Sequence, residues 1–404
     1  VYSGRERPDI SLAPIPRFDL LDTGKYFSMS LQYSRGCPFS CEFCDIIELF
    51  GRKPRTKTPT RFIAELNALY ATGYRGSVFI VDDNFIGNRA EVRKLLPAIS
   101  AWQKERSYPY NLFTEASINL AQDDSLMEGM VEAGFDMVFL GIETPVEETL
   151  LKAGKVQNTK ASLMESVKKI QRRGIEVSAG FIIGFDSDPD DIFDRQIEFI
   201  QDSGIVMAMV GLLMALPGTA LYRRLAKEGR LLGECSGNNT HDAKHSMNFV
   251  TVMDARTLAD GYRRVLGEIY RPGNYFARCR TLMERMPKHD TTVRKTTWRD
   301  IHALVRSLFR QTFSRYGFIY LRFLISSARK DIRLFPDAVR MSIMGHHFFR
   351  ITADLLARSH ELEVQNISSG KARAIRKRMK AEDAVIAVAA GLSPRRSAGI
   401  RAGK

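Results

Sequence analysis

Three cysteines, Cys37, Cys41 and Cys44, lie close together in the sequence with the spacing C-x3-C-x2-C. They directly follow an apolar stretch, 29–33, that has the composition of a β-strand. A 4Fe-4S cluster normally takes four cysteine thiolates, so a triplet with no fourth cysteine nearby leaves one iron open. An open iron can bind a ligand from outside the protein, and chemistry would take place there.

Other uses of clustered cysteines fit this triplet less well. Zinc normally takes four ligands, often as paired cysteines or histidines, and the first histidine of the chain is His241. An odd triplet is also a poor disulfide framework. Cys235 and Cys279 are isolated, and we interpret them as ordinary thiols. Thiols that must stay reduced indicate the cytosol.

The segment 35–44, Arg-Gly-Cys-Pro-Phe-Ser-Cys-Glu-Phe-Cys, resembles the signature of the radical S-adenosylmethionine (SAM) superfamily, including the aromatic Phe43. The resemblance implies that Cys37, Cys41 and Cys44 hold a 4Fe-4S cluster and that Phe43 lies beside the cofactor. It further implies that the open iron chelates SAM. An electron from the cluster, delivered by a reducing donor, would then cleave SAM to a 5′-deoxyadenosyl radical.

The composition is that of a folded protein. The chain has 404 residues, of which 44% are hydrophobic and 26% charged, which is enough for about two or three domains with buried cores. The sequence has no apolar run of about eighteen residues, so it predicts no membrane span, and the first residues do not resemble a signal peptide. The net charge of +14 suits nucleic acid, an anionic membrane surface or a basic soluble protein, and does not choose among them.

Short apolar runs alternate with amphipathic segments from about residue 28 to 230, the pattern of βα units around a parallel sheet. The predicted strands are 29–33, 77–81, 111–116, 137–142, 177–183 and 206–213. The predicted helices are 59–71, 89–105, 124–133, 160–173, 190–202 and 220–227. Gly73, Gly134, Gly174 and Gly204 stand where left-handed helix caps are expected. Six such units predict an α/β fold, a partial TIM-like (β/α)6 barrel, with functional residues at the carboxyl ends of the strands.

Polar residues follow these predicted strands. Asp82 and Asp83 come after the second strand, where the superfamily often has a Gly-Gly-Glu-like segment that binds the amino group of SAM. A carboxylate can accept from an ammonium group, so we predict a SAM contact by at least one of the two. The alternative is that one of them caps the following helix.

The resemblance implies further cofactor contacts at the next three strands. Glu115 and Ser117 end the third strand, and Glu143 ends the fourth, where superfamily members place side chains that meet the ribose or methionine of SAM. An internal salt bridge is the alternative for Glu143. The fifth strand is similar to the Gly-x-Ile-x-Gly segment that lines the adenine, and its matching residues are Gly180, Ile182 and Gly184.

The turn Leu-Pro-Gly-Thr-Ala-Leu-Tyr at 216–222 resembles that of a subgroup that often carries a cobalamin-binding domain upstream, and the alternative is a simple tight turn at Pro217-Gly218. The run 44–57, the Val-Asp-Asp-Asn run at 81–84 and the helical, basic C-terminal region resemble a cobalamin-type branch that includes the hopanoid C-2 methylases. The resemblance implies a methyltransferase that uses cobalamin to methylate an unactivated carbon of a lipid, such as a hopanoid, or of another small molecule. The chain has no Asp-x-His-x-x-Gly cobalamin motif. Either a cobalamin domain lies upstream of Val1, which we expect, or the protein works without cobalamin.

The rest of the chain is predicted to be mainly helical. The predicted organisation is a linker over 1–24, a radical SAM barrel over 25–235, a connecting region over 236–291, a helical domain over 292–381 and a disordered basic tail over 382–404. Aromatic residues alternate with arginines near 298–323. They would form the buried face of the helical domain, stack on nucleic-acid bases or lie at a lipid interface.

Two other functions stay open at this point. A tRNA-modifying radical SAM enzyme would use the basic charge to bind RNA, although a nucleic-acid partner is not favoured. A non-catalytic iron-sulfur redox sensor would need the cysteines but neither an open iron nor the strand-end carboxylates. For the methyltransferase we predict a cytoplasmic protein with a small-molecule or lipid substrate and with membrane contact at its surface.

Overall fold

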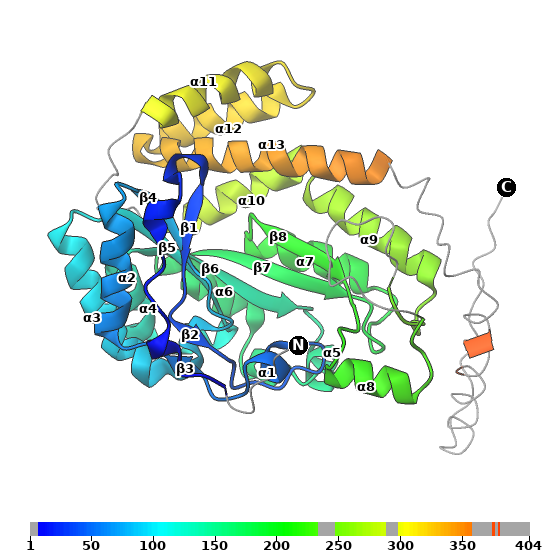
Figure 1. Cartoon of the computed structure of the whole chain (residues 1–404). Helices are drawn as coiled ribbons and strands as arrows, with labels where there is room; N and C mark the ends of the chain where they lie inside the picture. Colours follow the sequence, from blue (N-terminus) through cyan, green and yellow to red (C-terminus); the bar gives the residue numbers. More distant parts are fainter. Residues whose placement is uncertain (1–6, 233–246, 288–297, 358–373, 376–378, 380–404) are drawn as a thin grey trace.

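The structure is a computed structural model that describes residues 7–232, 247–287, 298–357, 374–375 and 379. Six parallel strands, in the order β1-β4-β5-β6-β7-β8, curl into a half-barrel (Figure 1). The strands are β1 (Ser28–Leu31), β4 (Gly76–Ile80), β5 (Tyr110–Ala116), β6 (Phe135–Glu143), β7 (Glu176–Ile183) and β8 (Ala208–Leu212). The prediction of an α/β partial barrel of six strands is confirmed.

Helices cover the convex face of the half-barrel. They are α2 (Pro59–Ala71), α3 (Arg89–Glu105), α4 (Asp124–Glu132), α6 (Leu163–Arg172) and α7 (Ile192–Ser203). Every second strand residue is buried beneath these helices, including Val78, Leu112, Val138, Leu140 and Phe181. The alternate residues, such as Phe79, Phe113 and Phe139, face the concave side and are only half buried. The concave face is thus left for a ligand.

Glycine ends the helices at four junctions with the sheet. Gly73, Gly134, Gly174 and Gly204 have φ angles of 82°, 88°, 90° and 69°. This left-handed conformation strains a residue that has a Cβ atom. The predicted left-handed caps are confirmed.

Several element boundaries differ from the prediction. Helix α6 begins at Leu163 rather than at 160, because the Ser162 hydroxyl caps it by accepting from the Glu165 amide at 3.3 Å. An antiparallel pair, β2 (Ser34–Arg35) and β3 (Arg55–Thr56), was not predicted. Three short helices lie near this edge of the sheet, namely α1 (Ile46–Leu49), α5 (Glu147–Lys152) and α8 (Ala220–Lys227).

The region 236–291, predicted only to connect domains, contains two long helices. They are α9 (Ala255–Ile269) and α10 (Pro272–Arg285), which contact α7. Three helices follow where helices were predicted: α11 (Trp298–Thr312), α12 (Gly317–Lys330) and α13 (Phe335–Ala357). The Tyr275 hydroxyl of α10 donates to the Met341 carbonyl of α13 at 2.8 Å, and one hydrophobic core runs from the sheet into α12 and α13.

The described part of the predicted linker, 7–24, folds as three short 3-10 turns, and Ile10 and Phe18 are buried. The predicted tail, 382–404, lies outside the described residues, as does Cys235. The predicted domain boundaries stay predictions. Within the described residues, no helix is both long and apolar enough to span a bilayer.

Candidate functional site

The cysteine loop leaves the sheet at the carboxyl end of β1, as predicted from the strand pattern. Gly36 opens the loop with φ 103°, and a Cβ atom there would lie 2.8 Å from the Gly51 carbonyl oxygen. The Cys37 amide donates to the same oxygen at 3.2 Å. Only glycine fits this close approach, which starts the turn that presents the cysteines.

The three thiols lie near one another at the edge of the sheet. Cys41 is buried, and Cys37 and Cys44 are half buried. Burial raises the pKa of Cys44 to about 12, and the neighbouring Cys41 and Cys37 thiols raise it further against a backbone hydrogen bond. Burial likewise raises the pKa of Cys37. Without a cationic partner these thiols therefore stay protonated, and binding as thiolates would need a metal centre to stabilise their charge.

These residues fit an iron-sulfur cluster in the chemistry of their donors. No three His, Cys, Asp or Glu side chains of the described residues converge tightly enough to hold a single metal ion. A cubane spreads its cysteine ligands over separate iron corners, so its ligands lie farther apart than those of one ion. Three thiols and no fourth would leave one corner for a ligand. The assignment of Cys37, Cys41 and Cys44 to a cluster stays a prediction.

Two side-chain amides that the sequence analysis missed point at the cysteine sulfurs. Asn84 Nδ2 lies 3.8 Å from Cys37 Sγ, and Gln157 Nε2 lies 3.7 Å from Cys41 Sγ. Hydrogen bonds to sulfur tune the reduction potential of clusters. Asn84 directly follows the Asp82-Asp83 pair, so its place just after the carboxyl end of a predicted strand was a sequence signal for it. Gln157 carries no comparable sequence signal.

Contacts from distant segments hold the loop in place. The Glu42 amide donates to the Ala153 carbonyl at 2.9 Å, and the Glu42 carbonyl accepts from the Leu221 amide at 2.8 Å. Arg224 of α8 bridges the carboxylates of Glu42 and Asp186, at 3.1 Å and 2.9 Å. The cysteine loop is therefore tied both to the end of β7 and to α8.

Asp82 and Asp83 differ in what they bind. Asp82 is buried, and its carboxylate accepts from the Tyr33 amide at 2.7 Å and from the Ser34 amide and hydroxyl at 2.8 Å and 2.6 Å. Asp83 is half buried and accepts from the Gly36 amide at 2.8 Å. Neither caps a helix through its side chain, since Asn88 caps α3. Asp83 is the better placed of the two for the predicted SAM contact, which stays a prediction.

Glu115 faces the concave side, where acidic groups gather. Burial raises its pKa to about 7, and the charges of Asp83, Asp82 and Glu143 add to this effect while Lys155 opposes it. Ser117 lies beyond it and donates to Asn119 at 2.7 Å. Ser117 Oγ also lies 3.2 Å from Asn84 Nδ2. These predicted residues therefore come together at one edge of the sheet.

Glu143 forms the internal ion pair that was the alternative to a SAM contact. Its partner is Lys155, and the two side chains are only 10% and 12% exposed. Glu143 has φ 65°, which is costly for a residue with a Cβ atom. The pair lies so close to Gly141 that a Cβ atom there would clash with Glu143 Oε1 and Lys155 Nζ. Lys155 Nζ also lies 5.8 Å from the centre of the Phe43 ring.

The predicted adenine segment lies on β7 and just beyond it. Gly180 and Ile182 alternate with buried neighbours and face the concave side. Gly184 has φ 109°, and its amide donates to Asp188 at 2.8 Å. The rings of Phe43 and Phe185 pack edge to face with their centroids 5.8 Å apart, so this segment and the cysteine loop are adjacent. The adenine contact stays a prediction.

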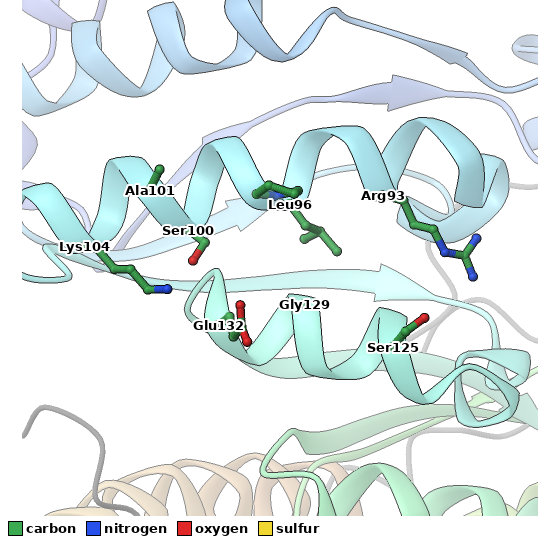
Figure 2. Close-up of a pocket in the computed structure, with 9 residues that line it drawn as sticks. Arg93, Leu96, Ser100, Ala101, Lys104, Ser125, Gly129 and Glu132 are labelled. Atoms are coloured by element: carbon green, nitrogen blue, oxygen red, sulfur yellow. The ribbon is translucent and has the colours of Figure 1, made fainter.

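A surface groove of about 380 Å³ lies between α3 and α4, on the convex side of the sheet (Figure 2). Its lining includes Arg93, Leu96, Lys104 and Glu132. None of the predicted site residues lines it. The groove is a gap between two outer helices, whereas the chemistry-bearing side chains gather at the strand ends.

The fold and site define a class: a parallel α/β half-barrel with a cysteine loop and polar side chains at the carboxyl ends of its strands. Residues 31–200 match the Radical SAM superfamily, and residues 219–361 match a domain of unknown function, DUF4070. The chain belongs to the radical SAM superfamily, as the cysteine spacing predicted.

The curated relatives that the chain matches include methyltransferases. The chain is 42% identical over 353 residues to an uncharacterized methyltransferase of Synechocystis sp., covering 87% of this chain and 66% of the relative. It is 41% identical over 263 residues to the hopanoid C-2 methylase of Rhodopseudomonas palustris, covering 65% of this chain and 50% of the relative. The chain thus spans between half and two thirds of these relatives' length.

The fold is similar to that of OxsB, a cobalamin-dependent S-adenosylmethionine radical enzyme. The TM-score is 0.51 at 14% identity, over 93% of this chain and 62% of that chain. At this identity the likeness concerns the fold alone.

Proposed function

We propose that this chain is the catalytic part of a radical SAM C-methyltransferase. The observation that carries the proposal is the cysteine triplet at the edge of the half-barrel, with Asp83, Glu115 and the Glu143–Lys155 pair beside it. A cluster bound by Cys37, Cys41 and Cys44 would supply the electron that cleaves SAM to methionine and a 5′-deoxyadenosyl radical.

The residues of the chain would bind and orient SAM. A half-buried carboxylate such as Asp83 would accept from its ammonium group. Gly180 and Ile182 offer a flat apolar surface to the adenine on the concave face. The stacked rings of Phe79 and Phe113, with centres 4.8 Å apart, lie on the same face and would exclude water from the radical.

The identity to a hopanoid C-2 methylase supports methylation of an unactivated carbon in a lipid or another small molecule. Cobalamin would carry the methyl group. An external reductant and contact with a membrane surface complete the proposal. The comparisons do not favour a tRNA-modifying enzyme or a redox sensor.

Release of 5′-deoxyadenosine tests the proposed chemistry. The chain, reconstituted with iron and sulfide without oxygen, should release 5′-deoxyadenosine from SAM when dithionite is added. Cys41→Ala should reduce the yield to background. Cys279→Ala is the matched control, because Cys279 is buried within α10 and the yield should not change. An undiminished yield from Cys41→Ala would refute the assignment.

A further inference from the structure

One side of helix α11 is an exposed apolar stripe. Ile301, Val305, Leu308 and Phe309 follow one another at the spacing of one helix face and are 41%, 57%, 37% and 71% exposed. Phe313, just beyond the helix, is 81% exposed, and its ring lies 5.8 Å from that of Phe309. Scattered exposed apolar residues are ordinary, but a continuous patch marks an interaction site.

The opposite side of α11, which faces the protein, carries two buried polar residues beside the half-buried Ala303 and Leu304. Ser307 and Gln311 are buried there, and Gln311 Nε2 donates to Ser307 Oγ at 2.8 Å. Ser307 Oγ in turn lies 3.1 Å from the Tyr320 hydroxyl of α12. An amphipathic helix of a globular protein normally turns its apolar stripe to the core. In α11, by contrast, most of the large apolar side chains are exposed.

The exposed patch lies at the edge of the molecule. Helix α11 is the outermost layer, with α12 and α13 between it and the half-barrel (Figure 1). Helix α12 also exposes large apolar side chains, Phe318 and Ile325, which are 79% and 49% exposed. The buried aromatics of α12, Tyr320 and Phe323, point into the core instead. The predicted buried aromatic face is thus right for these two but wrong for Phe309, Phe313 and Phe318.

The same stretch is strongly basic. Residues 301–330 contain no Asp or Glu, and six exposed cations stand among them: Arg306, Arg310, Arg315, Arg322, Arg329 and Lys330. Within the part of the chain that the structure describes, Lys330 alone of these pairs with a carboxylate, that of Glu284 at 3.4 Å. The charge is therefore available to an anionic partner.

We propose that α11 and the start of α12 form a surface that docks on an anionic lipid bilayer, with α11 lying in the plane of the interface. The apolar stripe would enter the boundary between headgroups and acyl chains, and the arginines would meet anionic headgroups. A second copy of the chain would bring the same positive charge against itself, so charge complementarity favours the bilayer. The docking surface rests on the proposed function, because it would give the enzyme access to a lipid substrate. Its test measures binding and requires no catalytic turnover.

Vesicle sedimentation of the full chain tests the surface. The chain should bind vesicles of phosphatidylcholine with phosphatidylglycerol, and binding should weaken as salt is added. The double variant Phe309→Ser/Phe313→Ser should bind at least about tenfold more weakly, with an unchanged melting temperature because both rings are exposed. Phe27→Ser is the matched control: Phe27 is 91% exposed before β1, and its loss should leave binding unchanged.

Three results would overturn the docking surface. One is undiminished binding by the double variant, and another is equal binding of vesicles that contain phosphatidylcholine alone. The third is a double variant that dissociates a dimer of the wild type without any change in vesicle binding, since the patch would then join two copies. Release of 5′-deoxyadenosine is measured without vesicles, so failure of the radical chemistry is distinguished from failure of docking.

Discussion

At the scale of single residues, Lys155 links the parts of the candidate site. It pairs with Glu143 at the end of β6, lies over the Phe43 ring and is close to the Cys41 thiol. Burial by itself would lower the pKa of Lys155, but Glu143 and the Cys41 thiol outweigh burial, and the pKa is raised. Lys155 therefore keeps a positive charge beside the cysteine loop.

Removing the Lys155 charge should destabilise the protein. Lys155→Met leaves the Glu143 carboxylate buried without its partner, which typically costs about 3 kcal/mol of unfolding free energy. The double variant Lys155→Met/Glu143→Gln should recover most of that loss. Urea unfolding without oxygen measures both. Lys152→Met, which breaks the exposed pair with Glu148, is the control and should cost less than about 1 kcal/mol. Equal losses in both single variants would contradict a structural role for the buried pair.

Gln157 should raise the reduction potential of a bound cluster. Its amide N–H points at Cys41 Sγ and would stabilise the more negative, reduced form. Its Oε1 is buried without a partner among the described residues, so Gln157→Leu should fold well. The midpoint potential of the variant should be lower by an amount on the order of tens of millivolts. A redox titration followed by electron paramagnetic resonance measures it, and an unchanged or higher potential would count against this contact.

Asp188 should make stability depend on pH. Burial raises its pKa to about 7, against hydrogen bonds from the Gly184 and Phe185 amides and with a further increase from Asp186. Between about pH 4, the ordinary value for Asp, and pH 7 the folded state therefore holds a proton that the unfolded chain has released. The free energy of unfolding should fall as pH rises through this range and level off above it.

The variant Asp188→Asn isolates this effect, because its amide oxygen can still accept from both backbone amides. The difference in urea midpoint between wild type and variant should change steadily from about pH 4.5 to 7 and then stay constant, because the pKa of Asp188 is about 4 in the unfolded chain and about 7 in the folded protein. A difference independent of pH would show that Asp188 does not titrate in this range.

At the scale of elements, the repeating strands and helices could be predicted from the sequence, whereas single contacts between distant segments could not. The strands and outer helices follow from alternating burial and from glycine caps such as Gly73 and Gly134, which are local signals. The β2–β3 pair and the contact of Glu42 with Ala153 join segments that are distant in the sequence. Lys155 and Gln157 belong to the site only because the loop after α5 folds back onto the cysteines, and no local pattern indicates such a contact.

Glycine should be required at position 36 because a side chain would clash within the cysteine loop, and not only because the φ angle is positive. Gly36→Ala forces a Cβ atom against the Gly51 carbonyl, whereas Gly73→Ala, also at positive φ, meets nothing within 4 Å. The control Gly73→Ala should cost about 1 kcal/mol. Gly36→Ala should cost more and should lower the iron content after reconstitution, which a colorimetric iron assay measures. Full iron incorporation by Gly36→Ala would contradict this role.

At the scale of the whole molecule, the helical region after β8 is joined to the half-barrel. Arg340 of α13 pairs with Glu176 at the start of β7, and Tyr275 links α10 to α13. The residue pattern predicted that the region after 292 is helical, but it did not predict α9 and α10, because the same pattern indicates only a connection over 236–291. The outward orientation of α11 could not be predicted either, since periodicity identifies an apolar face but not the direction in which it points.

The half-barrel and helices α12 and α13 should unfold as one cooperative unit, because one hydrophobic core runs through them. Hydrogen exchange under native conditions should give similar opening free energies for the amides of β7 and those of the middle of α13. Markedly faster exchange throughout α13 would instead indicate that the helices form a separate domain.

The most direct test of the site is electron paramagnetic resonance of the reduced, reconstituted chain with and without SAM. A cluster held by Cys37, Cys41 and Cys44 has one iron free for SAM, so we predict a 4Fe-4S signal whose g-values shift when SAM is added. A cluster signal that is unchanged by SAM, or purified chain that holds zinc in place of iron and sulfide, would contradict the assignment of this site.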